Sequence, residues 1–100
     1  MLPAHILIVD DNAELRGTLR KCYEGAGYQV DEAACVSGAR AALARGTFQL
    51  VTVDVNLDGP DGVREDGKAL ALEIRSKYHC GIIMLSVITD RGAHNNWLQD

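Results

Sequence analysis

The chain has 100 residues, 47% of them hydrophobic and 24% charged, with a formal net charge of -4. This length and composition predict one globular domain, residues 1–100, with a single core. The acidic balance argues against direct nucleic-acid binding by this segment. No apolar run approaches the roughly 20 residues that span a bilayer, and the N-terminus lacks the pattern of a signal peptide. We therefore expect a cytoplasmic protein that makes no contact with a membrane.

The first elements are a buried strand and an amphipathic helix. Residues 6–9, Ile-Leu-Ile-Val, predict a strand that is buried on both faces and ends at Asp10 and Asp11. Asn12 is a favourable N-cap for a helix over residues 13–25. The periodicity predicts a core-facing stripe that consists of Leu15, Leu19, Cys22 and Tyr23. It also predicts a solvated basic face that consists of Arg16, Arg20 and Lys21.

The same theme then repeats. Residues 28–33 alternate apolar and polar side chains and predict an edge strand with one wet face. Ser37 is the expected cap of a second helix, which ends at Gly46. Residues 48–54 form another β-branched apolar run, and like the first strand it ends in a carboxylate, that of Asp54.

The second half begins with an unusually long connection. Residues 56–67 carry several glycines, a proline and acidic side chains, so we predict a loop. A helical pattern resumes at Ala69 and runs to Lys77. Residues 81–85 then predict a fourth strand, after which come Ser86 and a last helix beginning near Thr89.

Strands that alternate with helices predict an α/β doubly wound fold with a parallel sheet. The carboxyl ends of parallel strands lie at one edge of the sheet, where such folds bind their ligands. If neighbouring strands are about 4.8 Å apart, Asp10, Asp11, Asp54 and Ser86 converge within about 10 Å. Three carboxylates this close repel one another unless a cation lies among them, and Mg²⁺ prefers such oxygen ligands.

The cluster suggests phosphoryl chemistry. Asp11, Asp54 and a loop carbonyl just beyond Asp54 would suit a magnesium ion that also takes a phosphate oxygen. An aspartate can act as the nucleophile that forms an aspartyl phosphate, with the metal neutralising charge on the transferred group. The plainer alternative is that strand-terminal aspartates only cap the helices that follow them.

Taken together, these segments resemble the receiver domain of bacterial two-component response regulators. The resemblance implies a flavodoxin-like sheet of order 2-1-3-4-5, with the fifth strand absent from this chain. The segments that carry it, in this order, are Ile6-Leu7-Ile8-Val9-Asp10-Asp11-Asn12, Leu50-Val51-Thr52-Val53-Asp54-Val55-Asn56-Leu57, Asp66-Gly67-Lys68-Ala69-Leu70 and Ile82-Ile83-Met84-Leu85-Ser86.

The resemblance implies a role for each matching residue. Asp54 stands at the position of the phosphorylated aspartate. Asp10 and Asp11 match the acidic pair that holds Mg²⁺ or Mn²⁺, and the backbone carbonyl of Asn56 matches a further ligand. Ser86 matches the hydroxyl residue that bonds the phosphoryl group. The implied partners are a histidine kinase or phosphotransfer protein as donor, and an output domain or downstream protein as reader; the domain is not an enzyme with a separate substrate.

The chain departs from the family's pattern at several positions. Asp58 replaces the usual proline and residues 59–65 lengthen the loop, while Val87 stands where a small residue is usual. The lysine expected after a fifth strand is not in the sequence. We therefore expect a C-terminally incomplete receiver domain whose apolar fourth strand is an open edge, prone to pair with another chain as a homodimer.

Two alternatives remain open from the sequence. A pseudo-receiver, which binds a protein without being phosphorylated, would agree with Val87, the long loop and the absent lysine. A phosphatase of the haloacid dehalogenase type would use Val53-Asp54-Val55-Asn56 as its Asp-x-Asp motif. In that motif the second aspartate is the general acid, and Asn56 cannot transfer a proton in its place.

Overall fold

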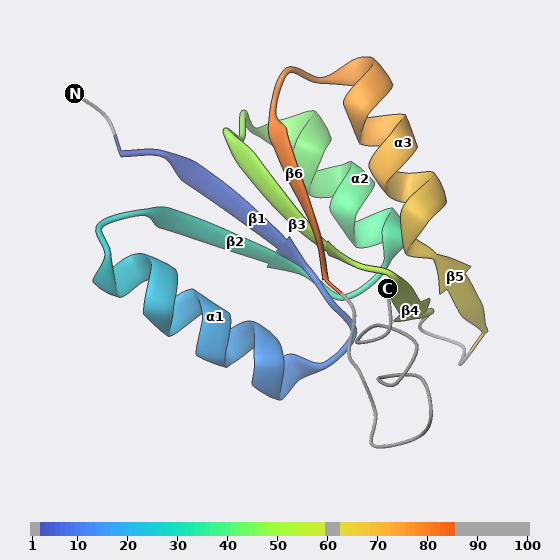
Figure 1. The fold of residues 1–100 in the computed structure, drawn as a ribbon, viewed down its shortest axis with the longest axis horizontal. Coiled ribbons are helices and arrows are strands. Elements are labelled where there is room, and N and C mark those ends of the chain that lie inside the picture. Colours follow the sequence, from blue (N-terminus) through green and yellow to red (C-terminus); the bar gives the residue numbers. More distant parts are fainter. Residues whose placement is uncertain (1–2, 60–62, 86–100) are drawn as a thin grey trace, which may run out of the picture.

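A computed structural model describes residues 3–59 and 63–85 of the chain. Within these residues the main sheet is parallel and has the order β2-β1-β3-β6 (Figure 1). Its strands are β1 (His5–Val9), β2 (Gln29–Ala33), β3 (Leu50–Asp54) and β6 (Gly81–Leu85). Because β6 is the predicted fourth strand, the doubly wound fold and the order 2-1-3-4 are confirmed. Ser86, Val87 and the helix predicted near Thr89 lie outside the described residues.

Helices cover both faces of the sheet, as right-handed crossovers between parallel strands require. The helix α1 (Ala13–Gly25) lies on one face, beside β1 and β2 (Figure 1). The helices α2 (Val36–Arg45) and α3 (Gly67–Lys77) lie on the other. The predicted helix over 13–25 therefore has the correct bounds, and the strand runs begin within two residues of their predicted starts.

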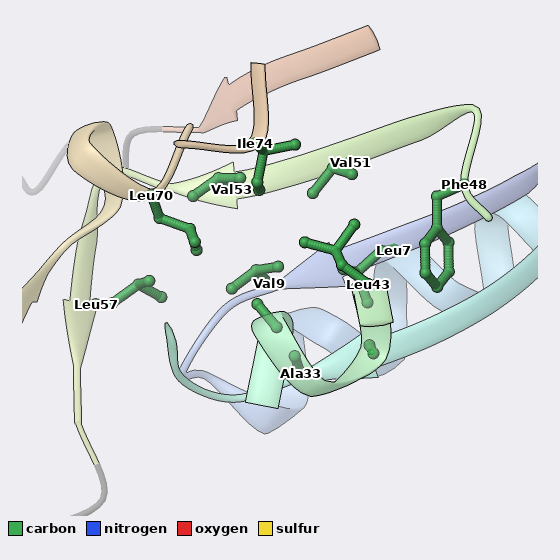
Figure 2. Packing of buried hydrophobic residues seen from close by; sticks show 12 residues of the cluster. Leu7, Val9, Ala33, Leu43, Phe48, Val51, Val53, Leu57, Leu70 and Ile74 are labelled. Carbon is green, nitrogen blue, oxygen red and sulfur yellow. The ribbon is translucent and has the colours of Figure 1, made fainter. Parts of the chain in front are cut away.

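The main core lies between the sheet and the pair α2 and α3 (Figure 2). Alternate residues of the central strands, Leu7, Val9, Val51 and Val53, point into it and are fully buried. Burying one such side chain contributes about 1.5–3 kcal/mol. The helices supply the opposite wall with Ala39, Ala42, Leu43, Leu70 and Ile74. This core fixes the central strands, and thereby the positions of their carboxyl ends.

The second core, under α1, is smaller. Ile6, Ile8 and Val30 are buried there, with Leu19 and Tyr23 of α1 packed against them. No residue of α1 is fully buried, and Cys22 is exposed. The predicted stripe of this helix is therefore right for Leu19 and Tyr23 and wrong for Cys22.

The helix caps agree only in part with the sequence. The Asn12 side chain accepts a hydrogen bond from the Leu15 N–H at 3.1 Å, so the predicted cap of α1 is confirmed. The predicted Ser37 cap of α2 is wrong, since Cys35 holds the N-cap position and makes no side-chain cap bond. Instead, the Glu65 carboxylate accepts the Val36 N–H at 2.9 Å. A contact this distant in sequence leaves no local signal.

The prediction of a loop over residues 56–67 is wrong. The segment contains β4 (Asn56–Asp58) and β5 (Arg64–Asp66), which pair antiparallel as a hairpin. Its strands are short and polar, so β propensity did not indicate them. One residue anchors the hairpin: Leu57 is fully buried and lies beside Val9 and Leu70 in the main core (Figure 2). The two strands are thus an ordered part of the fold beside Asp54.

The strand β6 borders the sheet in the described part of the chain. Its Ile83 and Met84 are 45% and 37% exposed, although the sequence of the strand is apolar throughout. This agrees with the expected apolar edge, while pairing with a second chain stays a prediction. Among residues 3–59 and 63–85, no helix is long and apolar enough to cross a membrane.

The main chain of Asp54 lies so close to Gly67 that a side chain at this position should destabilise the fold. A Cβ atom on Gly67 would overlap the Asp54 carbonyl oxygen, whereas a Cβ atom on Gly17, within α1, would meet nothing within 4 Å. We expect Gly67→Ala to lower the free energy of unfolding by about 2–3 kcal/mol. Gly17→Ala should raise it by about 0.5–1 kcal/mol, because alanine is the better helix former.

Urea unfolding of the two variants and the wild type measures both changes. Equal stabilities of Gly67→Ala and the wild type would contradict the close packing of α3 against the Asp54 main chain.

Candidate functional site

Three carboxylates meet at the carboxyl edge of the sheet. Asp10 and Asp11 follow β1 and Asp54 ends β3, and one oxygen of each lies within 4.8 Å of the others. Asp10 and Asp54 are buried, with 1% and 5% of their surface exposed, and Asp11 is half-buried. The predicted convergence of these residues is confirmed.

The register of the sheet explains why they meet. Val9 pairs with Val53, so the next residues, Asp10 and Asp54, are neighbours across the two central strands. The Asp10 N–H also donates to the Ala33 carbonyl at 3.0 Å, which extends the ladder with β2 by one residue. Packing of the apolar strands therefore places charged groups together that would otherwise separate.

Both buried aspartates use one oxygen to accept a hydrogen bond from the main chain two residues further on. Oδ1 of Asp10 accepts the Asn12 N–H at 2.8 Å, and Oδ1 of Asp54 accepts the Asn56 N–H at 3.0 Å. Oδ2 of Asp10 is buried without a hydrogen-bond partner in the described part of the chain. A buried oxygen without a partner is costly, and a cation among the three carboxylates would satisfy it.

Burial and mutual repulsion disfavour the charged state of this cluster. Burial raises the pKa of Asp54 above its ordinary value of 3.8; the Asn56 N–H opposes this, and the charges of Asp10 and Asp11 add to it. The pKa of Asp10 is also raised, first by burial and further by the charge of Asp11, while the Asn12 N–H and Arg16 oppose the rise. A cation bound among these carboxylates would therefore strongly stabilise their ionised form.

The hydrogen-bond pattern of the hairpin leaves the Asn56 main chain unpaired with β5. The Gly67 N–H donates to the Val55 carbonyl at 3.2 Å, and the Gly59 N–H donates to the Val63 carbonyl at 2.7 Å. Hydrogen-bonded and non-hydrogen-bonded pairs alternate along an antiparallel ladder. Asn56, opposite Asp66, is therefore at a non-hydrogen-bonded pair. Its N–H and carbonyl both point away from β5, and the N–H already bonds Asp54.

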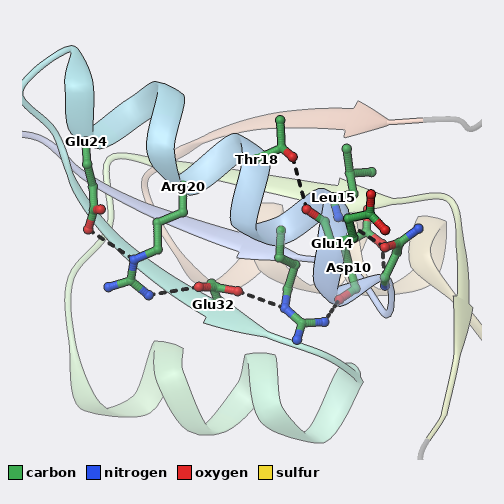
Figure 3. Close-up of polar contacts among 9 residues, drawn as sticks. Asp10, Glu14, Leu15, Thr18, Arg20, Glu24 and Glu32 are labelled. Carbon is green, nitrogen blue, oxygen red and sulfur yellow. Dashed lines mark hydrogen bonds and ion pairs between the residues drawn. The ribbon is translucent and has the colours of Figure 1, made fainter.

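A network of ion pairs, missed by the sequence analysis, holds the Asp10 main chain. The guanidinium of Arg16 donates to the Asp10 carbonyl at 2.6 Å and to Glu32 of β2 at 3.0 Å. Arg20 joins Glu32 to Glu24, as Figure 3 shows. The prediction of a solvated face is therefore wrong for Arg16, whose side chain is 16% exposed, and agrees with the structure for Arg20, which is 41% exposed, and for Lys21. The signal was Glu32 itself, a carboxylate on the strand beside β1.

The position of Ser86 relative to the cluster stays a prediction, because Ser86 lies outside the described residues.

The raised pKa of Asp54 predicts a pH-dependent gain in stability for Asp54→Asn without metal. A carboxyl whose folded pKa is raised contributes stability that is present below its unfolded value, here 3.8, and lost as the pH rises through the folded value. Asparagine does not ionise, and its side-chain oxygen can still accept the Asn56 N–H. We expect the variant to be about 1 kcal/mol more stable than the wild type at pH 7, and the difference to vanish near pH 4.

Thermal unfolding in chelator across this pH range measures the difference. A difference that does not change with pH would refute the electrostatic explanation.

Comparison with known proteins agrees with this geometry. The family model described as the response regulator receiver domain matches residues 6–99. The chain is 34% identical to ArcA, the aerobic respiration control protein of Escherichia coli K12, over 86% of this chain and 34% of that protein. It is 34% identical to the transcriptional regulatory protein ResD of Bacillus subtilis, over 94% of this chain and 36% of that protein. The chain thus spans about a third of the length of these relatives.

Solved structures give the same result. The response regulator TrrA of Thermotoga maritima, in complex with Mg²⁺-BeF, matches with a TM-score of 0.75 and 29% identity, over 94% of this chain and 79% of that chain. A response regulator of Burkholderia pseudomallei with a phosphorylated aspartic acid matches in fold, with a TM-score of 0.75 and 23% identity, over 96% of this chain and 54% of that one. The sheet order, the acidic cluster and the matched family model show that this chain belongs to the response regulator receiver domains of two-component signalling.

Proposed function

We propose that the chain accepts a phosphoryl group on Asp54 in a reaction that depends on Mg²⁺ or Mn²⁺. The observation that carries this proposal is the acidic cluster: three carboxylates from two strand ends, with oxygens within 4.8 Å of one another. Capping alone does not account for it. Asp10 and Asp54 each accept a hydrogen bond from the following main chain through one oxygen, Oδ1.

The residues present fit a divalent cation with oxygen ligands. Carboxylate oxygens of Asp10, Asp11 and Asp54, together with the Asn56 carbonyl, would hold it, and such an ion usually keeps some of its waters. When bound, the cation neutralises the negative charge of the carboxylates and of the transferred group. Oδ2 of Asp10, which has no hydrogen-bond partner among the described residues, supports this set of ligands.

The protein's own part in the transfer follows from the bonds of Asp54. Its Oδ1 is held by the Asn56 N–H, so Oδ2 is the oxygen that attacks phosphorus. A bond forms between this oxygen and phosphorus as the bond from phosphorus to the donor's histidine nitrogen breaks. That nitrogen keeps the electron pair and takes a proton from solvent. Ser86 is the proposed hydrogen-bond donor to the phosphoryl group after transfer.

The proposed donor is a histidine kinase or a phosphotransfer protein, and the proposed reader is an output domain or a downstream protein, in the cytoplasm. Membership of the receiver family supports this assignment. So does the likeness to TrrA, which has been solved with Mg²⁺-BeF. Phosphorylation would replace one carboxylate charge by about -1.5 to -2, and a charge change of this kind can bias a two-state segment.

Mass spectrometry after incubation with acetyl phosphate and MgCl₂ tests the proposal. We expect the mass to rise by one phosphoryl group in the wild type, and no rise in Asp54→Asn or in the presence of a chelator. The matched control is Asp31→Asn, which makes the same chemical change at an exposed carboxylate of β2 that pairs with His5. This variant should be modified like the wild type.

Failure of the wild type to gain mass would favour the pseudo-receiver, a binding module without phosphorylation. Continuous release of phosphate from a simple phosphomonoester would favour the phosphatase instead.

A further inference from the structure

The segment that carries Asn56 is held by contacts from several elements. The Val55 N–H donates to the Leu85 carbonyl of β6 at 2.8 Å, and the Val55 carbonyl accepts the Gly67 N–H. On the other side of Asn56, Leu57 is fully buried in the main core. The backbone of Asn56 thus lies between two anchored residues, and its position depends on the hairpin to which it belongs.

The hairpin is itself attached to α2 by one side chain. Glu65, opposite Leu57 in the ladder, accepts the Val36 N–H at 2.9 Å. Val36 is the first residue of α2, and that helix has no side-chain cap of its own. Negative charge at a helix N-terminus is stabilised by the exposed N–H groups and the helix dipole. This bond therefore fixes β5 to a helix packed against the central strands.

The fold makes room for this contact with a glycine. A Cβ atom on Gly59 would lie 3.1 Å from a carboxylate oxygen of Glu65 and 3.1 Å from the Val63 carbonyl oxygen. Any larger residue at 59 would press against the carboxylate that caps α2. The hairpin and the cap are therefore one structural unit, to which Gly59 and Glu65 both contribute.

We propose that Glu65 is a positioning residue for the metal: by tying the hairpin to the N-terminus of α2, it holds the Asn56 carbonyl where the cation needs it. This inference rests on the proposed function, since it takes the acidic cluster to bind a divalent cation. Glu65 acts through the hairpin and not as a ligand. Residues that orient metal ligands typically change metal affinity by 10- to 100-fold when they are removed.

The test is isothermal titration calorimetry of the protein with MgCl₂, with thermal unfolding measured in parallel. We expect Glu65→Ala to raise the Kd for Mg²⁺ by about tenfold. Glu65→Gln should stay close to the wild type, because its side-chain oxygen can still accept the Val36 N–H. Rescue by glutamine would separate this hydrogen bond from the negative charge of Glu65.

A second variant removes the other end of the bond. Val36→Pro deletes the donated N–H at the first position of α2, where proline is well tolerated, and Cys35 before it already has an extended backbone. It should weaken Mg²⁺ binding like Glu65→Ala, and the double variant should be no weaker than either single one. A further tenfold loss in the double variant would show that Glu65 acts by another route and overturn the proposal.

The matched control removes a different contact of α2, its ion pair with α3. Glu73 of α3 pairs with Arg40 of α2 through two bonds, of 2.8 and 3.0 Å. Glu73→Ala should lower the melting temperature and leave the Kd for Mg²⁺ unchanged. An equal loss of affinity in this control, or a Glu65→Ala variant that melts earlier but binds Mg²⁺ like the wild type, overturns the positioning role.

The same titration separates this inference from the proposed function. If the wild type binds Mg²⁺ and Asp11→Asn does not, the acidic cluster is the binding site, and the Glu65 variants then decide the inference alone. If the wild type binds no Mg²⁺, the proposed function fails first and the positioning role fails with it.

Discussion

The repulsion among three buried or half-buried carboxylates is the constraint on which the site depends. Asp10, Asp11 and Asp54 are forced together because the apolar strands that precede them pair in a fixed register. A one-residue slip of β1 against β3 would turn one set of apolar side chains away from its core. The free energy gained by burying apolar side chains in the two cores therefore offsets the repulsion between the three carboxylates.

The fold limits that cost in two ways. Main-chain N–H groups bond one oxygen of Asp10 and one of Asp54, which lowers the energy of each ionised form. Arg16 adds a positive charge behind the cluster, held by Glu32 and bonded to the Asp10 carbonyl and not to its carboxylate. Because this cation binds the main chain, it compensates the cluster without occupying the space between the carboxylates. That space stays suited to a divalent ion.

The sequence predicted those features that arise from periodicity and from residues adjacent in the chain. The strand ends at Asp10 and Asp54 and the Asn12 cap rest on local patterns, and each is found in the structure. The helix opening at Asp66 was implied by the resemblance to receiver domains and is found as well. The acidic cluster followed because parallel strands align their carboxyl ends.

The features that were missed join distant segments. The Glu65 cap of α2 spans 29 residues and the Arg16–Glu32 pair spans 16, so no local pattern indicates them. The hairpin was missed because glycines and acidic residues normally indicate a loop, and because one buried side chain, Leu57, outweighs them. Contacts between side chains that are distant in the sequence depend on how the elements pack, and the sequence does not show this packing directly.

These missed contacts also bear on how a phosphorylated form would differ from the free protein. The backbone at Val55 and Asn56 is bonded to β6, to α3 and to Asp54, so it is fixed to two packed elements and to the proposed phosphoacceptor. A segment held by several bonds to packed elements moves only if these are broken together. Under the proposed function, we therefore do not expect the response to a phosphoryl group to start in this backbone. Ser86, which directly follows β6, is the residue through which we expect it to start.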